Sequence, residues 1–201
     1  MTTENDELLI KVRRYQASML KDAYRDLMED EGHKKLVTFL LDTVYAPEDI
    51  YATAETFGVM YDYSIKRLKD EPAAMFSKLM ELNRLTDEID RSLAQKIGGA
   101  SEITGAAYGD ALRACDNRKD RERHVGLLVE CVTSLHQLTR HPLNAFMFKG
   151  IKLLLPYLGR PKAIKVVEEG YNTLLGIEDI SRFGEVVRKR ELERLAGAYG
   201  D

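Results

Sequence analysis

The chain has 201 residues, of which 44% are hydrophobic and 31% are charged, with a formal net charge of −3 and an isoelectric point of about 5.9. This length and composition fit one globular domain that can bury a sizeable hydrophobic core. The small excess of acidic residues argues against a general attraction to nucleic acid or to anionic membranes, because both depend on many lysines and arginines.

The N-terminal segment shows no targeting signal. It is acidic, with Glu4, Asp6 and Glu7, and it lacks the basic and apolar regions of a signal peptide. No apolar run approaches the roughly 18 residues that a membrane helix needs. We therefore expect a cytoplasmic protein with no transmembrane segment and no nucleic-acid partner.

Apolar residues recur every three or four positions along the chain and seldom alternate with polar ones, which predicts helices throughout. We expect helices over the following residues: 3–29, 33–45, 47–69, 70–97, 101–115, 119–140, 143–155, 161–175 and 180–196. The predicted fold is all-α, a single-domain irregular bundle of eight or nine helices that spans residues 1–201. Within it, residues 1–31 could act as a detachable or dimerising N-terminal arm. Residues 119–158 hold the most apolar helices and should be central.

The segment at residues 39–49, FLLDTVYAPED, predicts a helix end, a turn and a new helix. Its apolar residues share one helix face, and Tyr45 carries the only polar atom on that face. Pro47 suits the first turn of a helix, because its fixed φ and missing N–H are tolerated there. The segment should therefore form a corner between two packed helices.

The same segment resembles the signature of the bacterial FFLEELY-motif proteins, an uncharacterised family. The matching positions are Phe39, Leu41, Tyr45, Pro47 and Asp49. Thr43 departs from the pattern, which has glutamate there, and residues 53–54 replace an Arg-Asp pair. Residues 82–90, 155–158, 169–171 and 190–191 are also similar to the family, so the likeness covers most of the chain. It implies no activity, because the family is itself uncharacterised.

Motifs of known chemistry are not recognisable in the sequence. The four histidines have no metal-ligand spacing, and Cys115 and Cys131 have neither metal nor redox spacing. Both cysteines fit reduced core thiols. The chain also lacks a nucleophile elbow and a phosphate-binding glycine-rich loop. We therefore predict no metal and no cofactor, assign no catalytic residue and leave enzyme activity undecided.

A polar pocket between helices is the candidate site that the sequence offers. Its candidate ligand-pocket residues are Asp42, Tyr45, Asp62, Arg84 and Asp87. Carboxylates can act as acid and base when burial separates their pKa values. The same residues are also compatible with a buried ion-pair network or with solvated helix faces.

Strong amphipathic patterning without a catalytic motif predicts a non-enzymatic interaction or scaffold protein. We expect it to form a homo-oligomer or to bind a protein partner through an apolar helix face. The alternative is a small-molecule-binding protein or an enzyme with a polar pocket between helices.

Overall fold

The computed structural model of the protein describes residues 4–45, 58, 61–62, 70–99, 102–140 and 161–200. These residues form seven α-helices, one 3-10 helix and one π-helix, and no strand occurs among them. The all-α prediction is confirmed. The predicted helix at 143–155 and most of the one at 47–69 lie outside the described residues.

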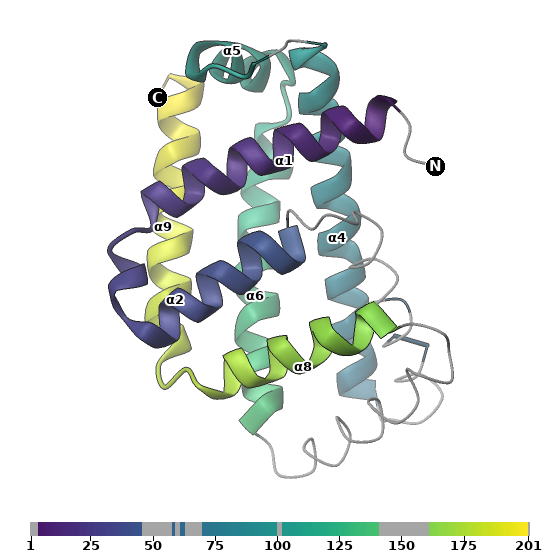
Figure 1. The fold of residues 1–201 in the computed structure, drawn as a ribbon, viewed down its shortest axis with the longest axis vertical. Coiled ribbons are helices and arrows are strands. Elements are labelled where there is room, and N and C mark those ends of the chain that lie inside the picture. The colour runs from purple at the N-terminus through teal and green to yellow at the C-terminus, as the bar shows by residue number, and fades with distance from the viewer. Residues whose placement is uncertain are drawn as a thin grey trace.

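Three long helices run side by side and form one layer of the molecule (Figure 1). They are α4 (Asp70–Ile97), α6 (Arg118–Arg140) and α9 (Ile180–Tyr199), and α6 contacts both of the others. The region that we expected to be central, 119–158, thus includes the middle helix of this layer. Residues 141–158 lie outside the described part of the chain.

Other helices cross over this layer and form a second one (Figure 1). They are α1 (Glu4–Ala23), α2 (Glu31–Thr38), which continues into the π-helix η2 (Phe39–Tyr45), and α8 (Pro161–Leu175). A short helix, α5 (Gly105–Ala114), contacts α4 and α9 at one end of the molecule. The two layers face each other across the interior of the protein.

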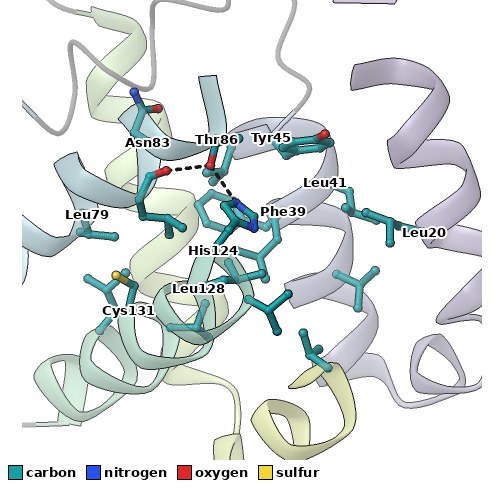
Figure 2. Close-up of a pocket in the computed structure, with 18 of the residues that line it drawn as sticks. Leu20, Phe39, Leu41, Tyr45, Leu79, Asn83, Thr86, His124, Leu128 and Cys131 are labelled. Atoms are coloured by element: carbon teal, nitrogen blue, oxygen red, sulfur yellow. Dashed lines mark hydrogen bonds between the residues drawn. The ribbon is translucent and has the colours of Figure 1, made fainter. Parts of the chain in front are cut away.

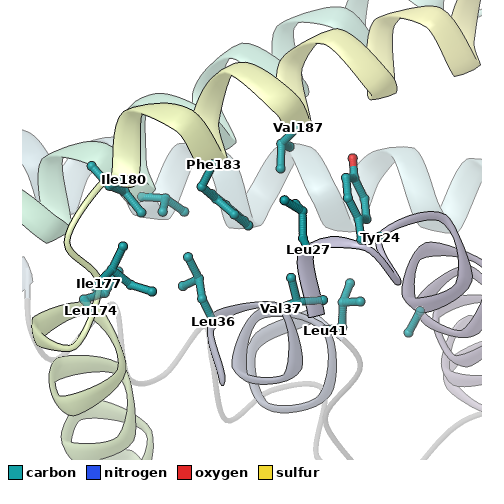
Figure 3. Close-up of a cluster of buried hydrophobic side chains, with 12 residues drawn as sticks. Tyr24, Leu27, Leu36, Val37, Leu41, Leu174, Ile177, Ile180, Phe183 and Val187 are labelled. Carbon is teal, nitrogen blue, oxygen red and sulfur yellow. The ribbon is translucent and has the colours of Figure 1, made fainter. Parts of the chain in front are cut away.

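A cluster of buried apolar side chains joins the two layers (Figure 3). Phe183 and Val187 of α9 face Leu36 and Val37 of α2, and Leu36 is completely buried. Burying one such side chain contributes roughly 1.5–3 kcal/mol. This cluster therefore supplies much of the energy that holds the crossing layer in place.

The first helix is shorter than the predicted 3–29, because α1 ends at Ala23 and the 3-10 helix η1 (Leu27–Glu29) follows. Arg190 of α9 donates a hydrogen bond of 3.0 Å to the Ala23 carbonyl and binds both oxygens of Asp26. That carbonyl would otherwise accept the N–H of Leu27 and continue the helix. The hydrogen bond from Arg190 also lowers the pKa of Asp26 to about 2.

In the structure, α1 packs against α4 and buries Leu9 and Val12 completely. The N-terminal segment therefore supplies part of the core. Its detachment as an arm stays a prediction.

Gly170 of α8 provides a test of how closely the layers pack. A Cβ atom at this position would lie 2.8 Å from Cζ of the buried Phe39 ring. We expect Gly170→Ala to lower the free energy of unfolding by about 1–2 kcal/mol, which is the overpacking penalty minus the gain in helix propensity. Gly126→Ala in α6 meets nothing within 4 Å and should stabilise the protein slightly. Urea denaturation measures the free energy of unfolding of both variants. Equal changes in the two variants would contradict the close contact between Gly170 and Phe39.

Candidate functional site

A cavity of about 260 Å³ lies between the two layers of helices. Side chains from α1, η2, α4, α6, α8 and α9 line it. Most of these side chains are apolar, as Figure 2 shows for Phe39, Leu79 and Leu128. Natural small-molecule sites have mostly apolar walls and a few placed polar groups. This cavity is therefore the candidate functional site.

Polar side chains gather at one end of the cavity. α4 and α9 end near α5, and α6 begins there, so their terminal turns meet at this end (Figure 1). The last three turns of α4 and α9, the first turns of α6 and the middle of α1 supply the charged residues that line the cavity, together with Gln16 and His124: Arg13, Gln16, Asp90, Arg121, His124, Glu191 and Arg194. The cavity thus has a polar end near α5 and a mainly apolar remainder.

A buried ion pair connects α1 to α4 at the polar end. Arg13 Nε lies 2.9 Å from Asp90 Oδ2, and only 8% and 4% of the two side chains are exposed. Burial raises the pKa of Asp90, and the charge of Arg13 opposes that effect. Removal of Arg13 would leave Asp90 as a buried carboxylate without its paired counter-ion. The pair therefore fixes the position of α1 on α4.

Tyr45, the last residue of η2, extends this network. Its hydroxyl lies 2.5 Å from Gln16 Oε1 and 3.2 Å from Asp90 Oδ1, and it is the donor toward these two acceptors. Gln16 Nε2 donates in turn to the Tyr108 hydroxyl at 3.1 Å. Burial raises the pKa of Tyr45 well above its usual value, so the hydroxyl stays protonated. One network thereby joins α1, η2, α4 and α5.

His124 of α6 faces Thr86 of α4 across the cavity wall (Figure 2). The Thr86 hydroxyl donates its proton to the Leu82 carbonyl at 2.8 Å, so it accepts from His124 Nε2, also at 2.8 Å. Burial, followed by the nearby charge of Arg121, lowers the pKa of His124 to about 4. The imidazole is therefore neutral at pH 7 and carries its proton on Nε2.

Both carboxylate oxygens of Glu191 in α9 accept hydrogen bonds from neighbouring side chains. Its Oε1 accepts a hydrogen bond of 2.8 Å from the Tyr24 hydroxyl, and its Oε2 accepts from Arg194 Nη2 at 2.6 Å. Burial is the main cause that raises the pKa of Tyr24, and Glu191 adds to it. This second polar group ties η1 and the preceding turn to α9.

Arg121 differs from the other arginines of the cavity. Its Nε donates to Asn117 Oδ1 at 2.8 Å, but its Nη2 has no hydrogen-bond partner among the described residues. The residue is only 7% exposed. Buried polar groups in proteins are nearly always hydrogen-bonded, so a free buried N–H group requires an explanation.

Two of the five predicted pocket residues belong to this region. Tyr45 lines the cavity. Asp87 lies at the edge of the polar group, where its Oδ1 is 3.3 Å from Arg13 Nη2 and its Oδ2 is 2.7 Å from Arg91 Nε. Arg13 thus connects the two predicted residues.

The structure does not bring the other three predicted residues to the cavity. Asp42 is exposed and forms a 2.7 Å ion pair with Lys21. Arg84 is exposed and pairs with Glu88 one turn later on α4. Asp62 is exposed as well. These charges stay in solvent because full burial of an ion carries a large desolvation penalty.

Several polar residues of the cavity were not among the predicted pocket residues, although the sequence carries a signal for three of them. Arg13 and Gln16 follow Leu9 and Val12 on one face of α1, and Arg121 precedes Val125 by one turn on α6. A polar residue on an apolar stripe indicates a buried polar group with a partner elsewhere. The same rule identified Tyr45, and applied to the whole chain it finds Arg13, Gln16 and Arg121.

Cys131 lies at the apolar side of the cavity (Figure 2). Burial raises the pKa of its thiol to about 12, so the thiol stays protonated and behaves as an apolar group. Cys115 is only partly buried, and both cysteines are free. In the part of the chain that the structure describes, no three His, Cys, Asp or Glu side chains are grouped to hold a metal ion.

Residues 2–198 match the model of a family described as a domain of unknown function, DUF8198. No curated protein and no solved structure matches the chain. The match agrees with the uncharacterised family that the sequence suggests, while the likeness to the FFLEELY-motif proteins stays a resemblance. Within the described residues, no helix has both the length and the apolar character to cross a membrane.

The ion pair between Arg13 and Asp90 is tested by a matched pair of substitutions. Arg13→Met should lower the free energy of unfolding by about 3–5 kcal/mol, because it leaves Asp90 buried without a counter-ion. Arg84→Met removes one partner of an exposed pair on α4 and should change it by less than about 0.5 kcal/mol. Urea denaturation measures both values. Similar losses for the two variants would show that the buried pair has no special role.

The low pKa of His124 predicts a pH dependence of stability. Between pH 6.5 and about pH 4 the unfolded chain protonates this histidine and the folded protein does not, so stability falls as pH falls. His124 should account for a loss of roughly 3 kcal/mol at pH 4, and for none above pH 6.5. His124→Gln should remove that share of the loss. Urea denaturation of the unmodified protein and of the variant, at pH values from 7 to 4, tests this prediction. An equal loss of the free energy of unfolding in the two proteins would contradict it.

Proposed function

We propose that this chain, which belongs to the DUF8198 family, binds a small and largely apolar molecule in the cavity between its helix layers. The observation that carries the proposal is the cavity itself, with mainly apolar walls and its charged side chains near one end. Such a cavity excludes water from most of a ligand's surface and orients the ligand by its polar end.

The size of the cavity limits the size of the ligand. An apolar cavity of about 150 Å³ takes up benzene, which has six carbon atoms. In proportion, a cavity of 260 Å³ holds a molecule of about ten non-hydrogen atoms. The proposed ligand is therefore smaller than a nucleotide cofactor or a peptide.

The apolar wall of the cavity also favours an apolar occupant. The cavity is partly open to solvent, so water contacts this wall when no ligand is bound. Removal of apolar surface from water is favourable, and an apolar ligand would provide it.

Of the two functions that the sequence predicts, the cavity favours ligand binding. The role as a self-associating scaffold stays a prediction. Three large hydrophobic side chains are exposed among the described residues, namely Met80, Leu175 and Leu192, and they belong to three different helices.

The two free thiols fit the cytoplasmic location that the sequence predicts, because thiols persist in a reducing compartment.

We propose binding and not catalysis because the polar groups of the cavity engage one another. Arg13 pairs with Asp90, Glu191 pairs with Arg194, and His124 donates to Thr86. A catalytic acid or base must instead be available to a proton of the substrate.

Octan-1-ol, a neutral molecule with nine non-hydrogen atoms, tests the proposal by calorimetry. At roughly 0.6 kcal/mol per atom we expect one saturable site with a dissociation constant of the order of 0.1 mM, and a rise in melting temperature. Leu128→Trp replaces a lining side chain with a larger indole ring, which occupies part of the cavity, and should weaken binding at least fivefold. Leu192→Trp, the same change on the exposed face of α9, should leave binding intact. No saturable binding to the unmodified protein would refute the proposal.

A further inference from the structure

We infer that the ligand is an apolar monocarboxylate, a carboxylic acid anion with one charged end and a hydrocarbon tail, and that its carboxylate binds the free Nη2 group of Arg121. This inference rests on the proposed function and names the ligand class for the same cavity.

The first argument is that the three arginines that line the cavity differ in the partners of their guanidinium groups. Arg13 contacts the carboxylates of Asp90 and Asp87, and Arg194 contacts Glu191 through both Nε and Nη2. Within the part of the chain that the structure describes, Arg121 donates to the neutral oxygen of Asn117 and its Nη2 stays without a partner. Its guanidinium therefore keeps a desolvated N–H donor that can bind a ligand carboxylate, and no existing ion pair has to break.

The second argument is the charge of the cavity. Among the described residues, three arginines and two acidic residues line it, which gives the lining a net charge of +1. His124 adds no charge at pH 7, since its pKa is about 4. One negative charge on the ligand would balance the site, whereas a dianion or a cation would leave a net buried charge.

The third argument is the arrangement of the lining along α6. Arg121, Val125, Leu128, Val132 and Leu135 all line the cavity, and their spacing puts them on one face of the helix. At about 1.5 Å per residue, the distance along the axis from Arg121 to Val132 is about 16 Å. A carboxylate at Arg121 therefore leaves room for a hydrocarbon tail beside the apolar residues of the same face.

A buried water molecule is the competing occupant of Nη2, because a water in a polar niche can satisfy a free donor. With a water there, a carboxylate would gain nothing over an alcohol of the same length. The experiment therefore compares ligands that share a tail and differ in the charge at their ends.

Calorimetric titration of the unmodified protein with three eight-carbon ligands tests the charge preference. Octanoate, which has ten non-hydrogen atoms, should bind at least tenfold more tightly than octan-1-ol. Octanedioate should bind at least tenfold more weakly than octanoate, because its second carboxylate would enter the apolar part of the cavity. Equal affinities of octanoate and octan-1-ol would overturn the inference and leave the proposed function standing. If neither molecule binds, both fail.

Two variants of α6 test the assignment to Arg121. Arg121→Met keeps an apolar stem of similar length and removes the free donor, so it should fold, as thermal denaturation will show. It should lose the tenfold preference for octanoate over octan-1-ol. Arg123→Met removes a charge from an exposed position two residues away and should keep the preference. An unchanged preference in Arg121→Met overturns the assignment, and should this variant not fold, the three ligands on the unmodified protein decide.

Discussion

The buried ion pair between Arg13 and Asp90 is the interaction on which the rest of the structure depends. Apolar contacts, such as those of Phe183 with α2, supply stabilisation but little directional preference. The ion pair and the hydrogen bonds of Tyr45 and Gln16 require defined distances. They therefore set how the layer of α1, α2, η2 and α8 sits on the layer of α4, α6 and α9. The cavity lies between these layers, and its polar end is this network. Position and polarity of the site thus have one physical origin.

The segment at residues 39–45 shows how one stretch of sequence serves several purposes. In its π-helix, Phe39 and Leu41 form part of the cavity wall, while Asp42 pairs with Lys21 on the surface. Tyr45 turns inward and joins the ion pair. Single-turn π-helical geometry is frequent at functional sites, because the wider turn changes the direction of the side chains. The segment therefore connects the surface, the core and the candidate site.

Helix periodicity was enough to predict the all-α class, and most of the helix ends follow glycine, proline and capping residues. The early end of α1 could not be predicted, because it depends on Arg190, 167 positions from Ala23. The candidate site is similar: Arg13 and Asp90 are 77 positions apart, and no local pattern shows that they meet. Asp42 and Arg84 lie on helix surfaces, where they pair with the exposed Lys21 and Glu88, so their charges indicated solvated faces and not a pocket.

The central claim is that the cavity holds an apolar monocarboxylate with its charged end at Arg121. A crystal structure of the protein grown with octanoate measures this most directly. The account predicts a carboxylate oxygen within hydrogen-bonding distance of Arg121 Nη2 and the hydrocarbon chain alongside Leu128. A water molecule on Nη2 with an otherwise empty cavity, or an octanoate bound with its carboxylate away from Arg121, would contradict it.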